Sequence, residues 1–401
     1  MTAFSAEDYV YLDWAATAPL CEEAARAMAP FLVPGRVNVA LGANANSLHS
    51  PGRAAFAALE DARRSLARDL HAARASEIVL TSGATEADNA AVLGLARAAV
   101  DARRQAGRAA AVPHVVTTAV EHEAVLEPVR VLERAGYRVT RLAPDARGFV
   151  QAGALADAVD GDTVLVSVQM ANSEVGSIQP VADLAQIAHE AGALFHTDAT
   201  QALGKMPVDL AALGVDAASF SAHKVGGPKG VGALYLRART PFSAQLLGGG
   251  QEQNYRSGTE ALPAIAAFGA ACAAAYPTRM ADLRHQAALR DTLRQNIAQL
   301  PGWQLLGAAE APQIISCALP GVPSQNIINL LQDHDCYVSA GSACSKGHRS
   351  HVLQACGLPP AVIDSSIRIS LSRFTTEAEA AQLLAAMQAA TAYFKAHEKR
   401  R

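Results

Sequence analysis

The chain has 401 residues, 50% hydrophobic and 18% charged, which is enough to bury a large core and more than one compact domain usually holds. Its formal net charge of -3 gives no basic field that would attract nucleic acid or an anionic membrane surface. Its 6 cysteines include no Cys-x-x-Cys pair, so neither a disulfide framework nor a metal site is indicated. No apolar run is long enough to cross a bilayer. We therefore expect a soluble, cytoplasmic, two-domain protein that acts on a small molecule or another protein.

Short apolar, often β-branched runs alternate with helical stretches from Glu77 to Tyr235. Strands are expected at 77–80, 114–117, 163–168 and 193–196, with helices at 86–100, 123–135 and 181–190. Strands that alternate with helices predict an α/β fold with a large, mostly parallel sheet covered on both faces.

The pattern changes after Gly250. A long Ala-rich helical region is expected at about 262–300, followed by strands at 313–319 and 366–371. The last helix begins with Thr376 and Glu379 in the spacing of a capping box. This region predicts a smaller C-terminal α/β domain. The expected division is an N-terminal segment at 1–20 that packs with the small domain, a large domain at 21–260 and the small domain at 261–401.

Three expected strand ends carry polar residues. The segment 81–86 opens a helix with small and hydroxyl residues, which suits an anion, although such a start is more often only a helix cap. Asp198 either caps a helix or pairs with a protonated ring nitrogen. Lys224 is either solvated or the amine of a Schiff base. The Gly-rich stretch 225–230 that follows lacks the spacing of a nucleotide-binding P-loop.

The order of these features favours one cofactor. Pyridoxal 5'-phosphate (PLP) needs an anchor for its phosphate, a partner for its pyridine nitrogen and an amine for its aldehyde. Because the carboxyl ends of parallel strands meet at one edge of a sheet, the three features are expected to lie together. The sequence therefore predicts a PLP enzyme.

Nine stretches, in order, resemble cysteine desulfurases of the iron–sulfur-cluster and nitrogen-fixation type, which belong to the class V aminotransferase group. The stretches are 11–17, 81–89, 118–122, 172–176, 198–205, 219–236, 256–260, 341–345 and 367–374. The resemblance implies a homodimeric, fold-type I PLP-dependent transferase with a large sheet domain and a smaller C-terminal α/β domain.

The resemblance also implies which residues bind the cofactor. They are Ala84, Thr85, Ser173, Asp198, Gln201, Ser221, His223, Lys224 and Thr259. Among them, Asp198 would pair with the pyridine nitrogen and Gln201 with the ring hydroxyl. Lys224 would form the Schiff base, and Thr259 would reach the phosphate of the neighbouring subunit. Many family members have Asn where Ser173 stands, so the contact expected there is changed in this chain.

The catalytic residues implied by the resemblance are Lys224, Cys344 and His122, and the substrate-binding residues are Asn172 and Arg368. His122 would lie over the ring as a proton carrier, although a histidine at a helix start is as often exposed to water. Arg368 would bind the substrate carboxylate through its planar fork, against the simpler alternative of a surface ion pair.

Cys344 lies among small and polar residues, whereas a lone cysteine is more often buried. Lys346, His348 and Arg349 follow it and favour its thiolate form. The other five cysteines stand in apolar or helical surroundings and are assigned to packing. The stretch from Cys344 to Val352 is shorter than in long-loop members and lacks their proline, which reduces the reach expected of Cys344.

The resemblance implies that the chain converts L-cysteine to L-alanine and leaves sulfur as a persulfide on Cys344. A sulfur-acceptor protein, such as an iron–sulfur scaffold, would then receive the sulfur. One alternative is selenocysteine lyase or another PLP reaction on the same fold, because fold and cofactor do not fix the reaction. A catalytically silent scaffold protein is a second alternative, disfavoured by the joint presence of Thr85, Asp198 and Lys224.

Overall fold

The larger unit is built on a seven-stranded sheet in a computed structural model that describes residues 9–35, 42–108, 110–341 and 349–398. The strand order is β2-β8-β7-β6-β5-β3-β4. Strand β8 runs antiparallel to the other strands of this sheet, which are parallel to one another, so the expected mostly parallel sheet is confirmed. The strands are β2 (Ile78–Thr81), β3 (His114–Thr118), β4 (Arg138–Leu142), β5 (Thr163–Ser167), β6 (Leu194–Asp198), β7 (Ala217–Ser221) and β8 (Gly232–Leu236).

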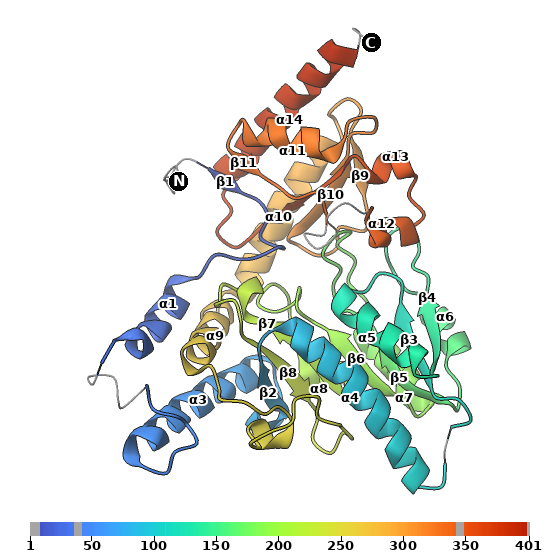
Figure 1. Cartoon of the computed structure of the whole chain (residues 1–401). Coiled ribbons are helices and arrows are strands. Elements are labelled where there is room, and N and C mark those ends of the chain that lie inside the picture. Colours follow the sequence, from blue (N-terminus) through green and yellow to red (C-terminus); the bar gives the residue numbers. More distant parts are fainter. Residues whose placement is uncertain (1–8, 36–41, 109, 342–348, 399–401) are drawn as a thin grey trace.

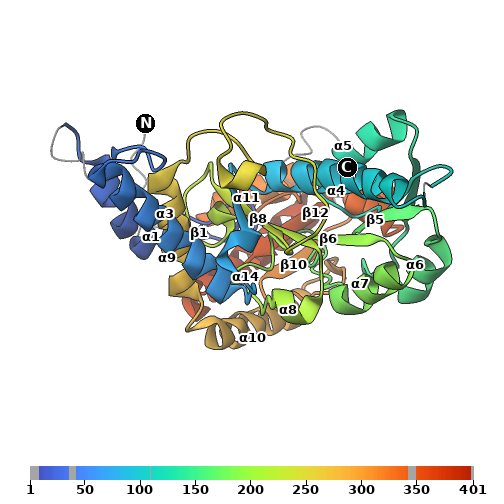
Figure 2. The same ribbon diagram turned by 90° about the horizontal axis from the view of Figure 1, so that it is seen from below.

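Helices cover both faces of this sheet, as Figure 2 shows. One face packs against α4 (Ala84–Gln105) and α5 (Glu123–Arg134), through residues such as Val92 and Val125. The helices on the other face are α3 (Ser50–Asp69), α6 (Ala152–Ala158), α7 (Val181–Glu190), α8 (Leu210–Leu213) and α9 (Leu262–Ala275). Two buried faces explain why the strands read as continuous apolar runs in the sequence. The partly exposed edge strand β4 lacks such a run and was not among the strands expected from the sequence.

The smaller unit lies above the large sheet in the view of Figure 1. Its sheet is antiparallel, with β10 (Ile314–Ala318) between β9 (Gln304–Leu306) and β12 (Ser366–Ser370). Its helices are α10 (Arg279–Ile297), α11 (Ser324–Gln332), α12 (His351–Ala355), α13 (Pro360–Ile363) and α14 (Glu377–Glu398). The capping box is confirmed, because Glu379 accepts the N–H of Thr376 and the Thr376 hydroxyl accepts the N–H of Glu379.

The N-terminal segment adds to the smaller unit. Strand β1 (Val10–Tyr11) pairs in parallel with β11 (Cys336–Tyr337), and the side chains of Val10 and Leu12 join the apolar core there. The chain then passes to the larger unit, where α1 (Glu22–Met28) and a 3-10 turn (Ala29–Leu32) lie beside α9. The N-terminal segment therefore connects the two units, which matters for the site between them.

The helical region expected at about 262–300 is two helices. Pro277, between α9 and α10, has no backbone N–H to continue a helix. Helix α9 packs on α1 and α3, and Phe268 belongs to the core of the large sheet. The larger unit thus extends to about Ala275, beyond the boundary at residue 260 expected from the sequence.

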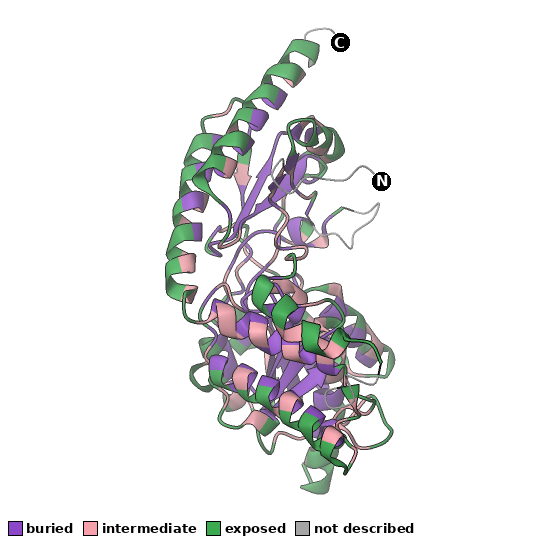
Figure 3. Cartoon of the chain, turned by 90° about the vertical axis from the view of Figure 1, so that its left-hand side faces the viewer, coloured by how far each residue is buried: buried purple, intermediate pink, exposed green. Residues whose placement is uncertain are grey.

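Burial differs sharply between the sheets and the outer helices. The strands of both sheets are buried apart from the partly exposed edge strands β4 and β9, whereas α14 exposes its outward face to solvent (Figure 3). Within the described ranges, none of the helices combines the length and the apolar character needed to cross a bilayer.

Candidate active site

A cavity of about 500 Å³ lies where the two units meet. It is lined by residues that follow β2, β6 and β7, by residues 15–17 of the N-terminal segment and by Arg368 of β12. Ten residues expected from the sequence line it, namely Ala84, Thr85, His122, Ser173, Asp198, Gln201, Ser221, His223, Lys224 and Arg368. The fold therefore brings together most of the residues that the sequence singled out.

The start of α4 forms one wall. Gly83 precedes the helix with φ +150°, and a Cβ there would lie 3.7 Å from the Ser221 hydroxyl. Gly83 offers no side chain to cap the 22-residue helix, so the first backbone N–H groups remain available to an anion. A Cβ at Gly232 would come within 2.6 Å of Gly83 Cα, so glycine is required where β8 passes.

His223 lines the same cavity as this helix start and stays neutral. Burial, followed by the charges of Lys224, Lys205 and Lys229, lowers the pKa of His223 to about 4. Its Nδ1 is 3.1 Å from the Thr17 hydroxyl. A neutral imidazole that keeps one N–H can donate to an anion without a protonation step.

Asp198 ends β6, and the backbone holds one of its two carboxyl oxygens. Its Oδ1 accepts the N–H of Thr200 at 2.9 Å, and the carboxylate lines the cavity. Beside it, Gln201 donates from Nε2 to the Ala15 carbonyl at 2.9 Å, while its Oε1 accepts from Lys205 Nζ at 3.1 Å. Burial and the charges of Lys224 and Arg368 lower the pKa of Lys205 to about 7. The Asp198 carboxylate and the fixed Gln201 amide thus face the same space.

Lys224 reaches the cavity from the short turn after β7. Its Nζ donates to the carbonyls of Ala15 and Ala16 at 2.7 and 2.8 Å. These carbonyls come from the N-terminal segment, which the sequence motifs had marked without assigning a contact. Lys224 is therefore held at the cavity wall by residues more than 200 positions earlier in the chain.

Arg368 enters from the smaller unit and is buried. Its Nη2 donates to Asp13 Oδ1 at 2.7 Å and its Nη1 to the Ser173 carbonyl at 3.2 Å. Its buried Nε has no hydrogen-bond partner among the described residues. The simpler alternative of a surface ion pair is thus excluded by position, because Arg368 is 2% exposed and lines the cavity.

Two expected site residues lie apart from this cavity. The Asn172 side chain accepts the N–H groups of Glu174 and Val175 and donates to the Val120 carbonyl. These bonds use its amide to shape a turn, and it faces a neighbouring cavity. Thr259 is exposed and does not line the 500 Å³ cavity. Cys344 lies outside the described residues.

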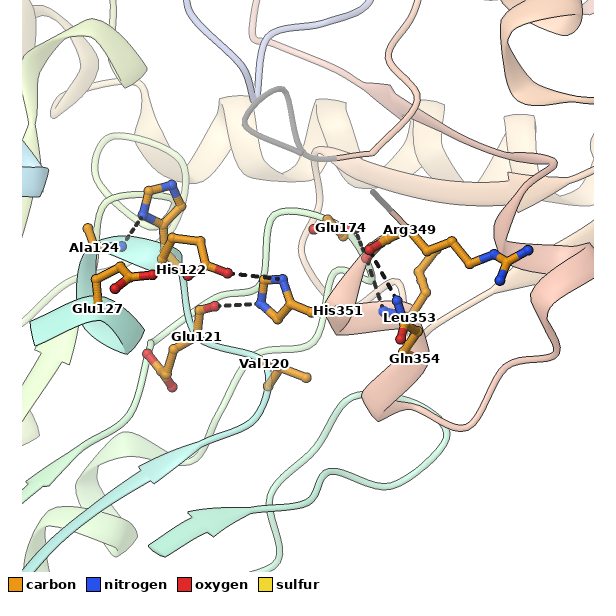
Figure 4. A network of polar contacts seen from close by, with 12 residues as sticks. Val120, Glu121, His122, Ala124, Glu127, Glu174, Arg349, His351, Leu353 and Gln354 are labelled. Carbon is orange, nitrogen blue, oxygen red and sulfur yellow. Dashed lines mark hydrogen bonds and ion pairs between the residues drawn. The ribbon is translucent and has the colours of Figure 1, made fainter. Parts of the chain in front are cut away.

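The neighbouring cavity has a volume of about 390 Å³ and shares His122, Gln169 and Ser173 with the first. Figure 4 shows its wall, where His351 reaches the backbone carbonyl of Glu121 at 2.9 Å. His122 lines both cavities. It also caps α5, because its Nδ1 accepts the N–H of Ala124 at 3.1 Å. This leaves the other ring nitrogen of His122 for a ligand.

The five described cysteines, Cys21, Cys272, Cys317, Cys336 and Cys356, are buried. Burial raises the pKa of Cys317 to about 12, and of Cys336 and Cys356 to about 11. Thiols of this kind remain protonated at neutral pH and are poor nucleophiles. Their expected packing role is confirmed. No cluster of three or more possible metal ligands occurs in the part of the chain that the structure describes.

Other residues of the cavity had not been singled out from the sequence. Gln169, Glu86, Lys229 and Asp88 also line it. Glu86 is paired with Arg256 at 2.8 Å, and its other oxygen accepts the N–H of Ser82. The helix-opening segment 81–86 included Glu86, and the resemblance motif 81–89 included both Glu86 and Asp88.

Comparison with known proteins agrees with this geometry. Residues 10–383 match the family model described as "Aminotransferase class-V". The chain is 39% identical over 376 residues to a protein named "Cysteine desulfurase IscS" from Serratia proteamaculans, covering 92% of this chain and 89% of the relative. A solved structure titled "NIFS-LIKE PROTEIN" shares 34% identity with a TM-score of 0.86, covering 96% of this chain and all of the other.

A second solved structure, "SspA in complex with cysteine", is 30% identical with a TM-score of 0.76 over 91% of this chain and 99% of the other. The expected α/β fold class is confirmed by these similarities. The resemblance noted in the sequence motifs is confirmed as well, and the chain belongs to the aminotransferase class-V family, in which its relatives include cysteine desulfurases.

Proposed function

We propose that the chain is a PLP-dependent cysteine desulfurase that converts L-cysteine to L-alanine and places the sulfur on Cys344. The observation that carries the proposal is one cavity that joins the start of α4, Asp198, Lys224 and Arg368. The family and the named relatives support the same activity.

The donor set fits PLP. The backbone at Ala84 and Thr85, with the Ser221 hydroxyl and neutral His223, would hold the phosphate. The free side of Asp198 would keep the pyridine nitrogen protonated, and Lys224 would bind the aldehyde. When bound, PLP supplies a ring that accepts electrons from the substrate α-carbon.

The substrate would lie between Lys224 and Arg368. Arg368 already bonds to Asp13 and the Ser173 carbonyl, so its guanidinium is oriented before a carboxylate arrives. His122, fixed by its bond to the Ala124 N–H, would move a proton at its other ring nitrogen. These positions would place the substrate amine near Lys224.

The transfer of sulfur requires a cysteine that can ionise to a thiolate, and burial disfavours this ionisation. The Cys344 thiolate would attack the substrate sulfur, forming an S–S bond while the substrate C–S bond breaks and its electrons go to the β-carbon. Protonation of that carbon gives alanine, so cysteine plus one enzyme thiol yields alanine plus a persulfide without another oxidant. Cys344 is the candidate because the five described cysteines are buried.

The partners and location remain proposals. We expect a homodimer in which Thr259, exposed here, reaches the phosphate site of the neighbouring subunit. A sulfur-acceptor protein would then take the persulfide sulfur. The cytoplasmic location expected from the sequence remains a prediction.

The test is to incubate the purified, PLP-loaded protein with L-cysteine and measure alanine and persulfide together. Equal amounts of alanine and persulfide sulfur in a single turnover are expected. Selenocysteine is assayed in parallel. Turnover of selenocysteine without turnover of cysteine would replace the proposal with a selenocysteine lyase, and pyruvate in place of alanine would indicate β-elimination.

A further inference from the structure

Asp88 is a buried carboxyl group in the wall of the main cavity that the proposed function does not use. It lies on α4, one turn beyond Ala84 and Thr85, and is 1% exposed. Neither carboxyl oxygen has a hydrogen-bond partner among the described residues. Its lack of partners sets it apart from Glu86, which lines the same cavity but is paired with Arg256.

The groups that face Asp88 offer no compensating cation. From β6, His196 Nε2 lies 3.6 Å from Asp88 Oδ1, and the charge of Asp198 acts on the same carboxyl. The Ser219 hydroxyl of β7 acts in the opposite direction and lowers the pKa of Asp88, and Glu121, in the segment before α5, adds a weaker effect that raises it. No lysine or arginine pairs with Asp88 within the described part of the chain.

His196 is itself committed to neutral partners. Its Nδ1 lies 2.9 Å from the Ser167 hydroxyl and its Nε2 lies 2.9 Å from the Ser219 hydroxyl. Burial lowers the pKa of His196 to about 4, so the ring carries no charge at neutral pH. His196 therefore cannot act as the cation for Asp88.

An unpaired carboxylate in such a place is strongly disfavoured. Transfer of an isolated charge from water into a protein interior is so costly that the group takes up a proton instead. Burial, and then the charge of Asp198, raise the pKa of Asp88 well above its usual range. In contrast to Asp88, Asp198 accepts a backbone N–H and is partly exposed in the cavity.

We propose that Asp88 is a neutral, proton-bearing carboxylic acid in the folded protein, so that of the two carboxyl groups only Asp198 takes part in binding the ring. This inference rests on the proposed function, in which Asp198 faces a protonated ring nitrogen. Residues three and four apart on a helix are neighbours, so an ionised Asp88 would also repel a phosphate at Ala84 and Thr85. Asp88 is thus a positioning residue that acts through Asp198 and the helix start.

The protonation state can be read directly in protein without cofactor. The infrared carbonyl band of a protonated carboxylic acid is measured at pH 7 in wild type, Asp88→Asn and the matched control Glu121→Gln. Asp88→Asn should remove one such band that Glu121→Gln leaves in place. Carbon-13 labelling of all aspartate carboxyl groups should shift the same band in wild type, which needs no variant to fold. Absence of a label-sensitive band, or its survival in Asp88→Asn, would overturn the proposal.

Ligand binding gives a second readout that packing alone would not produce. Because an amide is neutral at every pH, Asp88→Asn should bind PLP within about threefold of wild type, while Asp198→Asn should lose at least about tenfold. A loss in Asp88→Asn as large as in Asp198→Asn would show that the needed charge is on Asp88. If wild type bound no PLP, the proposed function would fail, whereas the infrared result would still decide the state of Asp88.

Discussion

Arg368 Nη2 donates to Asp13 Oδ1 at 2.7 Å, although the two residues are 355 positions apart. The pair joins the N-terminal segment to β12, and the Arg368 side chain is 3% exposed. Asp13 therefore orients the guanidinium toward the cavity.

Arg368→Ala should raise KM for cysteine by about 10- to 100-fold while PLP stays bound, since a charge-assisted hydrogen bond contributes about 1.5–3 kcal/mol. Arg368→Lys should restore little, because an ammonium lacks the planar fork. Asp13→Asn should raise KM less. Arg373→Ala is the control, as Arg373 donates to the Ala274 carbonyl outside this cavity. If KM were unchanged in Arg368→Ala and raised in Arg373→Ala, the substrate carboxylate would be bound by Arg373 instead of Arg368.

Lys224→Ala should abolish covalent attachment of the cofactor after borohydride reduction, because the amine that binds the aldehyde is lost. Lys229→Ala is the matched control, since Lys229 lines the same cavity but is exposed. Mass spectrometry of the digested protein locates the label. Continued labelling of the Lys224→Ala protein would contradict the assignment and make Lys205 the next candidate.

Cys344→Ser should retain cofactor binding and still take up cysteine, but persulfide formation should disappear. The control is Cys356→Ser, because burial raises the pKa of Cys356 to about 11 and leaves it unreactive. Peptide mapping after brief exposure to cysteine measures the extra sulfur. Sulfur found on the Cys356 peptide, or full activity in Cys344→Ser, would refute the central role of Cys344.

Glu121 should make stability depend on pH. Burial raises the pKa of Glu121 to about 8 in the folded chain, above its usual 4.5. The folded state therefore holds the proton more tightly, and the stability this provides is lost as pH rises from about 4.5 through about 8.

The amide side chain of the Glu121→Gln variant cannot ionise. The free energy of unfolding of this variant, relative to that of wild type, should therefore increase by up to about 1.4 kcal/mol for each pH unit across this window. Urea unfolding of the cofactor-free proteins at several pH values measures the difference. Glu127→Gln is the control because the Glu127 side chain is 60% exposed. A difference that does not change with pH would show that Glu121 is ionised throughout.

Mixed dimers test the position of Thr259. If Thr259 serves the neighbouring site, a dimer of one Lys224→Ala and one Thr259→Ala subunit contains one intact site. Refolding an equal mixture of the two inactive variants should then restore about a quarter of wild-type activity, because half of the dimers are mixed. No recovery, or activity in a monodisperse monomer, would place Thr259 elsewhere.

The amino-acid sequence alone determined the alternation of strands and helices and the polar residues at the strand ends. Apolar runs marked β3, β5 and β6, and the capping box marked the start of α14. Because parallel strands end at one edge of a sheet, these local patterns were enough to predict that Thr85, Asp198 and Lys224 share a cavity.

Only the tertiary structure decided what those residues contact. It packed α9 on α3, assigned the Asn172 amide to a turn and joined Arg368 to Asp13. It also buried Asp88 and Glu121 with no lysine or arginine paired to either among the described residues. Such features depend on residues far apart in the chain and on the cost of removing charge from water, and neither leaves a periodic pattern in the sequence.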